Sequence, residues 1–311
     1  MTITQLQYVL AVAEHQNFTL AAEKCFVTQP TLSMQIQKIE EELGVTIFNR
    51  SKKPIQLTEI GAKIVNQAKN IVNESNRIKD IVDQQKGYVG GEFRIGIIPT
   101  VMPTLLPMFI ASFQKKYPKV QLIIEELNTS DIITRLKNGH LDAAIAATPL
   151  DDDKIKEIVL YYEPFVAYVP ENHPLYAKKT LTPSDLNPSE ILLLRDGHCF
   201  RQSILNLCKL DSSENSFRIE SGSFETLSRL VDEGLGITLL PYLHTLNFAD
   251  EKKHRLRHFA DPKPAREVSL IFPNTELKKH IVEALRNSIS GVIRGAIAFH
   301  DVDIISPKQK K

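Results

Sequence analysis

The amino-acid sequence predicts an all-α winged helix-turn-helix domain with a long dimerisation helix, followed by an α/β region of two subdomains. Three observations support this fold class. Residues 3–44 carry apolar positions at helical spacing, residues 60–85 carry a seam with a period near 3.5, and strand-like runs alternate with helical runs after Gly91. The chain has 311 residues, and at roughly 100–200 residues per domain this length suggests about two or three domains.

The composition is that of an ordinary globular protein. Hydrophobic residues make up 42% of the chain, charged residues make up 24%, and the formal net charge is +1. These values exclude whole-chain disorder and a fibrous protein. No apolar run reaches the ~18 residues that a membrane-spanning helix requires, and the N-terminal segment carries Glu14 instead of the basic start of a signal peptide. We therefore expect a cytoplasmic protein.

Three short helices are predicted at the start of the chain. Residues 3–17 alternate at helical period, and Thr19 is a suitable N-cap for a second helix that ends near residue 25. Thr28 caps the third helix, Pro30 occupies its first turn, and Gly44 ends it. The buried stripe of the third helix consists of Leu32, Ile36, Ile39 and Leu43.

Two short helices joined by a tight turn form a candidate helix-turn-helix. The polar face of the second of these helices carries short donors and acceptors that suit base edges and phosphates, namely Gln29, Thr31, Ser33 and Gln35. A basic stretch then follows with Arg50, Lys52 and Lys53, and it predicts a hairpin wing beside the phosphate backbone. The same pattern taken alone is also compatible with a small helical domain that binds no DNA.

A long helix is predicted from Thr58 to Gln85. Its apolar seam averages near 3.5 residues per repeat, which is the period of a coiled coil. The seam consists of Ile60, Ile64, Ala68, Ile71, Ser75, Ile78, Val82 and Gln85. Packing on its own domain is the simpler explanation for a solitary helix, but a seam of this length favours pairing with a second copy. Gly87, Gly90 and Gly91 form a hinge to the next domain.

The region after Gly91 is predicted to be α/β with mostly parallel strands. Strands are expected at residues 93–98, 120–127, 141–147, 191–196, 217–221, 236–241 and 268–273, and helices at 101–117, 130–138, 199–208, 224–234 and from about 276. The extended run 158–169 makes a first crossing between two subdomains, and a second crossing lies near residues 262–267.

Two strand-to-helix turns carry hydroxyl groups, at Thr100 and Thr129. Ligands bind at such turns in open α/β sheets. The alternative is that both threonines only cap helices.

The three cysteines lie in different settings. Cys25 is expected to be a small core residue. Cys199 is predicted at a helix start between His198 and Arg201, where the helix N-terminus and nearby cations favour a partly exposed, low-pKa thiolate. Cys208 lies nine positions later in an apolar setting.

A helix over residues 199–208 and a disulfide between its cysteines exclude each other. Nine residues of helix rise about 13.5 Å and turn about 900°, so the two sulfurs face opposite sides. A disulfide requires Cα atoms within about 7 Å. Oxidation would therefore have to unwind the segment. The alternative is a pair of unrelated buried cysteines.

The segment VTQPTLSMQIQKIEEELGVTIFNRSKKPIQLTEIG closely resembles the DNA-binding segment of LysR-type transcriptional regulators, and the match runs from Ile3 to about Ile64. The resemblance implies a winged helix-turn-helix, a linker helix that dimerises, and an effector domain with periplasmic-binding-protein-like architecture. It places Gln29, Pro30, Thr31 and Ser33 on the reading helix and Arg50 to Lys53 on the wing. Met34 departs from the polar or basic residue common at its position.

A second likeness covers nearly the whole chain, to about residue 300. RDGHCFRQSILNLC and the downstream SFETLSRLVDEGLGITLLP resemble the redox segment of the hydrogen-peroxide-sensing LysR-type regulators. The resemblance implies that Cys199 is the peroxidatic thiol and Cys208 the resolving thiol. Thr100, Thr129 and His198 match residues that line the peroxide pocket, and Arg266 matches an arginine held near the reactive sulfur. Gln202 departs from the acidic residue common there, which would slow proton delivery to the leaving hydroxide.

The expected domains follow from these motifs. They are residues 1–58 (winged helix-turn-helix), 59–88 (dimerisation helix), 89–301 (redox-sensing region) and 302–311 (a disordered tail). The two subdomains of the sensing region are expected at 89–164 plus 267–301 and at 165–266.

The expected function is that of a DNA-binding activator of oxidative-stress defence genes that is not an enzyme. Its expected partners are operator DNA, further copies of itself in a dimer and then a tetramer, RNA polymerase, and thioredoxin- or glutaredoxin-like reductants. We expect no cofactor, metal site or membrane contact. The alternatives are a regulator that binds a small organic co-inducer, a solute-binding protein and a thiol peroxidase.

Overall fold

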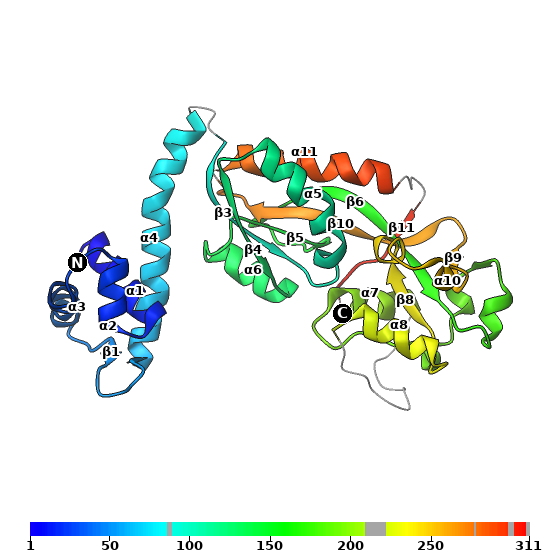
Figure 1. Cartoon of the computed structure of the whole chain (residues 1–311), viewed down its shortest axis with the longest axis horizontal. Helices are drawn as coiled ribbons and strands as arrows, with labels where there is room; N and C mark the ends of the chain where they lie inside the picture. Colours follow the sequence, from blue (N-terminus) through cyan, green and yellow to red (C-terminus); the bar gives the residue numbers. More distant parts are fainter. Residues whose placement is uncertain (86–88, 209–221, 277, 298–301, 309–311) are drawn as a thin grey trace. The chain divides into compact units, whose positions relative to one another are not determined.

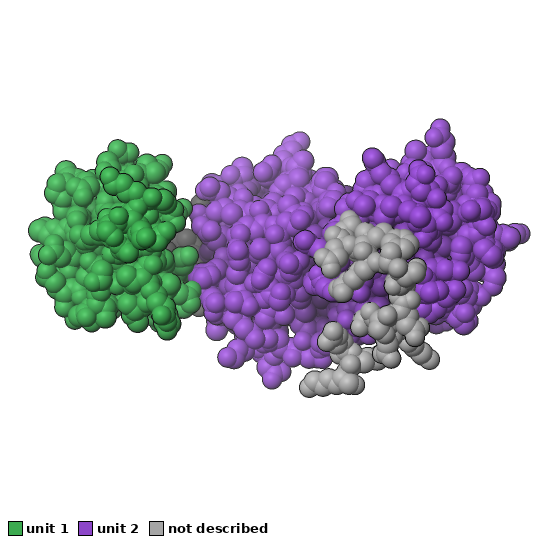
Figure 2. Space-filling model, turned by 90° about the horizontal axis from the view of Figure 1, so that it is seen from below, with its two compact units in different colours: residues 1–86 green, residues 87–311 purple. Residues whose placement is uncertain are grey.

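The computed structural model describes residues 1–85, 89–208, 222–276, 278–297 and 302–308. The chain divides into two compact units, Met1–Lys86 and Gly87–Lys311, which have different colours in Figure 2. No helix in the described part of the chain is both long enough and apolar enough to cross a membrane.

The first unit is a group of helices with a two-stranded wing (Figure 1). Its elements are α1 (Ile3–His15), α2 (Phe18–Lys24), α3 (Gln29–Leu43), β1 (Phe48–Asn49), β2 (Gln56–Leu57) and α4 (Glu59–Gln85). Apolar side chains of the four helices form one buried core. The third predicted helix is confirmed, because it begins after Thr28 and ends at Gly44, whose φ is 66°. The N-cap predicted for the second helix is wrong: Asn17, not Thr19, caps α2 through its side-chain oxygen.

The long helix is confirmed as α4, but its apolar seam is divided between two environments. Ala68 is 1% exposed and lies in the core of the first unit together with Val65 and Val72. Ile60 and Ile78 are 44% and 65% exposed. Part of the stripe, including Ile64 and Ile71, therefore packs on its own domain, whereas Ile60 and Ile78 present apolar surface to solvent.

The second unit contains one nine-stranded sheet that continues through two lobes (Figure 1). Its strand order is β4-β3-β5-β10-β6-β9-β7, with β11 beside β10 and β8 beside β6. The strands are β3 (Gly91–Ile97), β4 (Val120–Glu126), β5 (Ala143–Thr148), β6 (Ile155–Tyr168), β7 (Thr180–Leu181), β8 (Thr238–Pro241), β9 (Leu256–Phe259), β10 (Lys263–Pro273) and β11 (Val302–Ile304).

The α/β class is confirmed, but the expectation of mostly parallel strands is wrong. β3 pairs in parallel with β4 and β5, whereas β10 pairs antiparallel with β5 and β6, and β6 pairs antiparallel with β8 and β9. The sheet is mixed because β6 and β10 are the two crossing strands, and they run in opposite directions between the lobes.

Each lobe has its own hydrophobic core. The first lobe carries α5 (Met102–Lys116), α6 (Thr129–Lys137) and α11 (Lys279–Ala296). The second carries α7 (Cys199–Cys208), α8 (Phe224–Asp232), α9 (Tyr242–Thr245), α10 (Asp250–Lys253) and the short 3-10 helices η1 (Pro174–Ala177), η2 (Pro183–Asp185) and η3 (Pro188–Glu190). The helix predicted over residues 199–208 is confirmed with the same bounds.

Two predicted segments differ from the structure, and a third is not described. Residues 191–196 form no strand beyond a single bridge between Ile191 and Ile237, although residues 191–194 are buried. The expectation of a disordered tail is wrong for residues 302–308, because β11 pairs with β10 and the residues after it bond to the second lobe. The strand predicted at 217–221 lies outside the described residues.

Candidate functional site

Cys199 and Cys208 are free thiols at the two ends of α7. The helix buries Phe200, Ile204 and Leu207 in the second lobe. Cys208 packs against that same core, whereas Cys199 packs against the core of the first lobe. The two sulfurs therefore lie on opposite sides of α7, as the helical geometry requires.

The turn before α7 is fixed by its own residues. Gly197 has a φ of 89°, a backbone conformation that side chains with a Cβ rarely adopt. The Arg201 guanidinium lies 2.9 Å from a carboxylate oxygen of Asp196 and donates to the Leu194 carbonyl at 3.1 Å. These contacts tie the first turn of α7 back to the turn that precedes it.

Cys199 is half-buried between the lobes, so the predicted partial exposure is confirmed, but the prediction of a low-pKa thiolate is wrong. Burial raises the pKa of the Cys199 thiol, and this effect exceeds the lowering by Arg266, by the Thr129 hydroxyl and by the backbone N–H of Phe200. One of the expected cations, Arg201, is occupied by Asp196. Burial raises the pKa of Cys208 to about 11.

Arg266 is the centre of a buried polar network. It lies on β10 directly opposite Glu163 on β6 in the strand register, and each side chain is 1% exposed. The Arg266 Nε and Nη2 donate to one Glu163 oxygen at 2.9 and 2.7 Å. Its Nη1 donates to the Thr100 hydroxyl at 2.8 Å, and its Nη2 also donates to the Thr100 carbonyl at 3.0 Å. The Phe200 ring covers the guanidinium, 5.1 Å from its centroid.

Glu163 was missed by the sequence reasoning. Its second oxygen accepts the backbone N–H of Leu243 at 2.9 Å, so the carboxylate is fully engaged. A partial signal was present, because Glu163 is the one charged residue within the otherwise apolar second half of β6, but on β10 Arg266 is followed directly by Glu267. The sequence alone does not reveal the strand register that places Glu163 opposite Arg266.

The two threonines lie where predicted, but neither is an N-cap. Thr100 is 4% exposed and precedes α5, whose N-cap is Val101. Thr129 is the first residue of α6, whose N-cap is Asn128. The Thr129 hydroxyl oxygen is buried without an oxygen or nitrogen partner among the described residues, and its weak contact with the Cys199 sulfur lowers the pKa of that thiol. The Thr129 hydroxyl therefore faces Cys199, whereas the Thr100 hydroxyl is linked to Cys199 only through Arg266.

His198 lies next to Cys199 in the chain but is held by other groups. It is 6% exposed, and the Arg195 Nε lies 3.4 Å from its Nε2. Burial, with Arg195 as a smaller cause, lowers the pKa of His198, so the ring is neutral at pH 7. A Cβ added at Gly222 would lie 3.2 Å from the same ring nitrogen. The structure thus brings Thr129 and Arg266 to Cys199 and joins Thr100 to Arg266. His198 lies directly before α7 as a neutral side chain.

The first unit carries the polar face of α3 that is predicted to contact DNA, together with the predicted wing formed by β1 and β2. Gln29, Pro30 and Thr31 are exposed at the start of α3, and Ser33 and Gln35 are half-buried. The Gln35 amide oxygen accepts a hydrogen bond from Gln5 at 3.1 Å. Met34 is 49% exposed on the same helix. The face therefore presents short polar groups with one apolar side chain among them.

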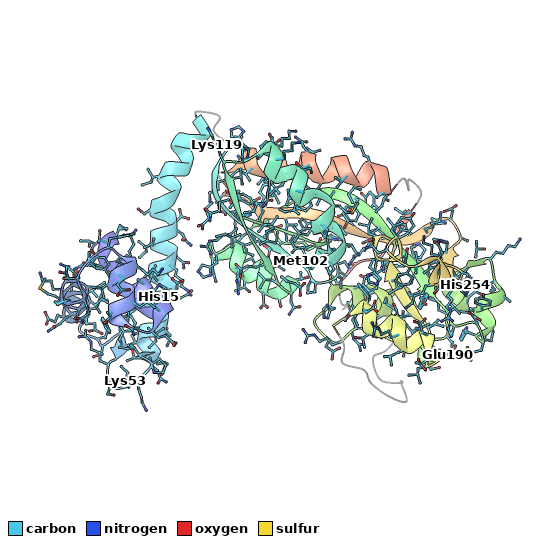
Figure 3. The ribbon with its side chains drawn as sticks, viewed as in Figure 1. His15, Lys53, Met102, Lys119, Glu190 and His254 are labelled. Carbon is cyan, nitrogen blue, oxygen red and sulfur yellow. The ribbon has the colours of Figure 1, made fainter. Side chains whose placement is uncertain are left out.

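The three basic residues of the wing are not equivalent. Arg50 forms an ion pair with Glu40 at 2.8 Å, and its guanidinium lies 5.2 Å from the centroid of the Phe18 ring. Lys52 and Lys53 lie in the exposed loop between β1 and β2, and Figure 3 shows Lys53 at the tip of that loop, pointing away from the helices. The lysines are thus the cations that this wing offers to solvent, while Arg50 is anchored to α3.

Two family models match the chain. The model described as "Bacterial regulatory helix-turn-helix protein, lysR family" matches residues 3–62, and the one described as "LysR substrate binding domain" matches residues 86–293.

Curated relatives are similar over almost their full length. The chain is 33% identical over 295 residues to a "Hydrogen peroxide-inducible genes activator" of Pectobacterium carotovorum, covering 94% of this chain and 98% of the relative. It is 33% identical over 297 residues to the "DNA-binding transcriptional dual regulator OxyR" of Escherichia coli, covering 94% and 97%.

Solved structures give the same result. A full-length OxyR variant from Pseudomonas aeruginosa superimposes with a TM-score of 0.75 at 34% identity, covering 93% of this chain and 98% of that one. A hydrogen-peroxide-bound OxyR mutant from Corynebacterium glutamicum superimposes with a TM-score of 0.65 at 27% identity, covering 95% and 93%.

Proposed function

Because the chain belongs to the LysR family of bacterial transcriptional regulators, we propose that it is a DNA-binding activator that senses hydrogen peroxide through Cys199 and Cys208. The observation that carries this proposal is the position of Cys199. Cys199 is half-buried between the lobes beside Thr129 and Arg266, and Arg266 also bonds to Thr100. Cys208 occupies the opposite side of the same helix. Full-length relatives named hydrogen peroxide-inducible genes activators support the same conclusion.

The first chemical step oxidises Cys199 to a sulfenic acid. The sulfur attacks one oxygen of hydrogen peroxide, the O–O bond breaks, and the thiol proton goes to the departing hydroxide, so that thiol and peroxide give sulfenic acid and water. The Thr100 hydroxyl accepts from Arg266, which leaves its own hydrogen free to donate to a peroxide oxygen. The Arg266 cation stabilises negative charge that develops on sulfur and oxygen during the transfer.

The second step joins the two cysteines. The Cys208 thiol attacks the sulfenic sulfur, its proton and the hydroxyl leave as water, and a disulfide forms. Since the helix holds the Cα atoms about 13.5 Å apart, α7 must unwind before the bond can form. The apolar side chains of α7 then lose their packing in the second lobe, which makes the segment a two-state element whose equilibrium is set by covalent chemistry.

DNA binding is assigned to the first unit. We propose that Gln29, Thr31 and Ser33 contact bases or phosphates, with Pro30 fixing the start of the helix, Gln35 at the edge of the face, and Arg50, Lys52 and Lys53 beside the backbone. The exposed isoleucines of α4 suit pairing with a second copy of the chain. Such a dimer places two α3 helices so that each can bind one half-site of a two-fold symmetric operator.

The proposed signalling cycle also includes formation of a tetramer and reduction of the disulfide. Within a tetramer, the repacking of the second lobe that follows unwinding of α7 alters the spacing of the winged units on DNA. RNA polymerase then responds to the new arrangement. Thioredoxin- or glutaredoxin-like reductants in the cytoplasm reduce the disulfide and restore the dithiol.

The test is alkylation mass spectrometry of the purified protein before and after micromolar peroxide. We expect a linked Cys199–Cys208 peptide in the wild type and in Cys25→Ser, none in Cys199→Ser or Cys208→Ser, and a peroxide-dependent change of DNA footprint that Cys199→Ser abolishes while its reduced-state binding remains. If both thiols stay alkylatable after peroxide, the sensing proposal is wrong, and an organic co-inducer held between the lobes becomes the better explanation.

A further inference from the structure

The C-terminal segment is attached to the sensing region along its whole described length. β11 pairs in parallel with β10 from Lys263 to Ala265, and the Ile305 N–H donates to the Ala265 carbonyl at 2.8 Å. The Ile305 side chain packs against the core of the second lobe. This places the residues that follow Ile305 directly beside α7.

Asn206 makes the connection between α7 and this segment. It lies on α7 between the two cysteines, and its side-chain amide donates to the Ser306 carbonyl at 2.8 Å and to the Lys308 carbonyl at 2.6 Å. Its oxygen accepts from Gln202, one turn earlier on the same helix, at 3.2 Å. Both amide hydrogens and the oxygen of this half-buried side chain are therefore used.

The segment also reaches the first lobe. The Lys308 ammonium forms an ion pair with Asp151, which lies between β5 and β6. Asn206 therefore joins α7 to a segment that is held at one end by the crossing strand β10 and at the other by the first lobe.

We propose that Asn206 is a positioning residue for the thiol chemistry: by bonding to Ser306 and Lys308 it holds α7 in the helical, dithiol form. This rests on the proposed peroxide-sensing function. The two bonds exist while α7 is a helix, and a Cys199–Cys208 disulfide requires α7 to unwind. The bonds therefore stabilise the dithiol over the disulfide, and their loss favours oxidation.

The size of the effect follows from the two hydrogen bonds. At roughly a fivefold change in an equilibrium constant for each bond, loss of both bonds shifts the dithiol–disulfide equilibrium toward the disulfide by about thirtyfold, which for a two-electron couple is about 45 mV. The reduction potential of the variant becomes more negative by that amount.

The experiment titrates the Cys199–Cys208 couple in glutathione buffers. Oxidised glutathione takes two electrons and two protons from the two thiols and gives two molecules of glutathione, and the linked fraction is read by alkylation mass spectrometry. Asn206→Ala and a chain that ends at Ile304 are compared with the wild type. Gln202→Ala is the matched control, because it also raises helix propensity on α7 but leaves both bonds to the segment intact.

We expect a shift of about thirtyfold toward the disulfide for Asn206→Ala and for the truncated chain, no such shift for Gln202→Ala, and no further shift when Asn206→Ala is combined with the truncation. Equal potentials for the wild type and both variants would overturn the positioning role while leaving the peroxide-sensing function standing. A wild type that forms no Cys199–Cys208 disulfide in any buffer would overturn both.

Discussion

Glu163→Gln tests the buried network around Cys199 most directly. The substitution keeps the size of the side chain but removes the negative charge that faces Arg266, and both side chains are 1% exposed. Removing one partner of a buried ion pair leaves an uncompensated charge, which destabilises a protein by about 3–5 kcal/mol. For a unit of this size each kcal/mol lowers Tm by about 2–4 °C, so we expect a Tm lower by roughly 10 °C.

The matched control is Glu92→Gln. Glu92 pairs with Arg94 at 2.9 Å, with the same chemistry as the buried pair, but the two side chains are 50% and 46% exposed. An exposed pair contributes about 0–1 kcal/mol, so the control is expected to lower Tm by at most about 4 °C. Thermal unfolding of the reduced protein, followed by circular dichroism, measures both.

A second measurement on Glu163→Gln reports on the thiol. Arg266 lowers the pKa of Cys199, and Glu163 balances that cation. Without the carboxylate, the pKa of Cys199 falls, so the pH profile of its alkylation rate moves to lower pH. An unchanged Tm together with an unchanged profile would refute the reasoning that this pair holds the site together.

The remaining predictions use single substitutions or pH. Because burial raises the pKa of Cys199 above its ordinary value, the thiol stays protonated at pH 7, and its alkylation rate keeps rising as the pH is raised above 7; a plateau at or below pH 7 would contradict this. Gly197→Ala forces a side chain into a φ of 89°, which costs about 1–2 kcal/mol, and a Tm equal to that of the wild type would exclude the strain. Lys53→Ala is expected to lower the slope of log K against log salt for operator DNA by about one per wing, whereas Lys115→Ala on α5 leaves the slope unchanged.

Local elements were predictable because their causes lie within a few residues. The bounds of α7 follow from its buried stripe and from Gly197 before it, and the bounds of α3 follow from Thr28 and Gly44. The sequence also identifies Thr100 and Thr129 as residues at strand-to-helix turns, although it leaves open whether they cap helices or face a ligand.

The rest depended on contacts between distant parts of the chain. The raised pKa of Cys199 results from burial by both lobes, which no local pattern contains. Glu163 meets Arg266 across 103 residues, and Asn206 meets Ser306 across 100 residues. The polar and basic composition of the C-terminus suggested a solvated tail. In the structure, pairing of β11 with β10 and the Asn206 side-chain amide on α7 hold residues 302–308 in place.

Phe200 explains how a change at one sulfur reaches both lobes. It is the residue after Cys199 and is fully buried. Its ring packs edge-on against Phe165 at 5.2 Å and Phe224 at 5.0 Å, and it covers Arg266 at 5.1 Å. When the first turn of α7 opens, this ring leaves β6, β10 and α8 together. Exposing a buried phenylalanine opposes the unwinding of α7 by about 1.5–3 kcal/mol. The helix therefore stays folded until oxidation of Cys199 offsets this free energy. When α7 unwinds, Phe200 no longer covers the buried Arg266–Glu163 ion pair between the lobes.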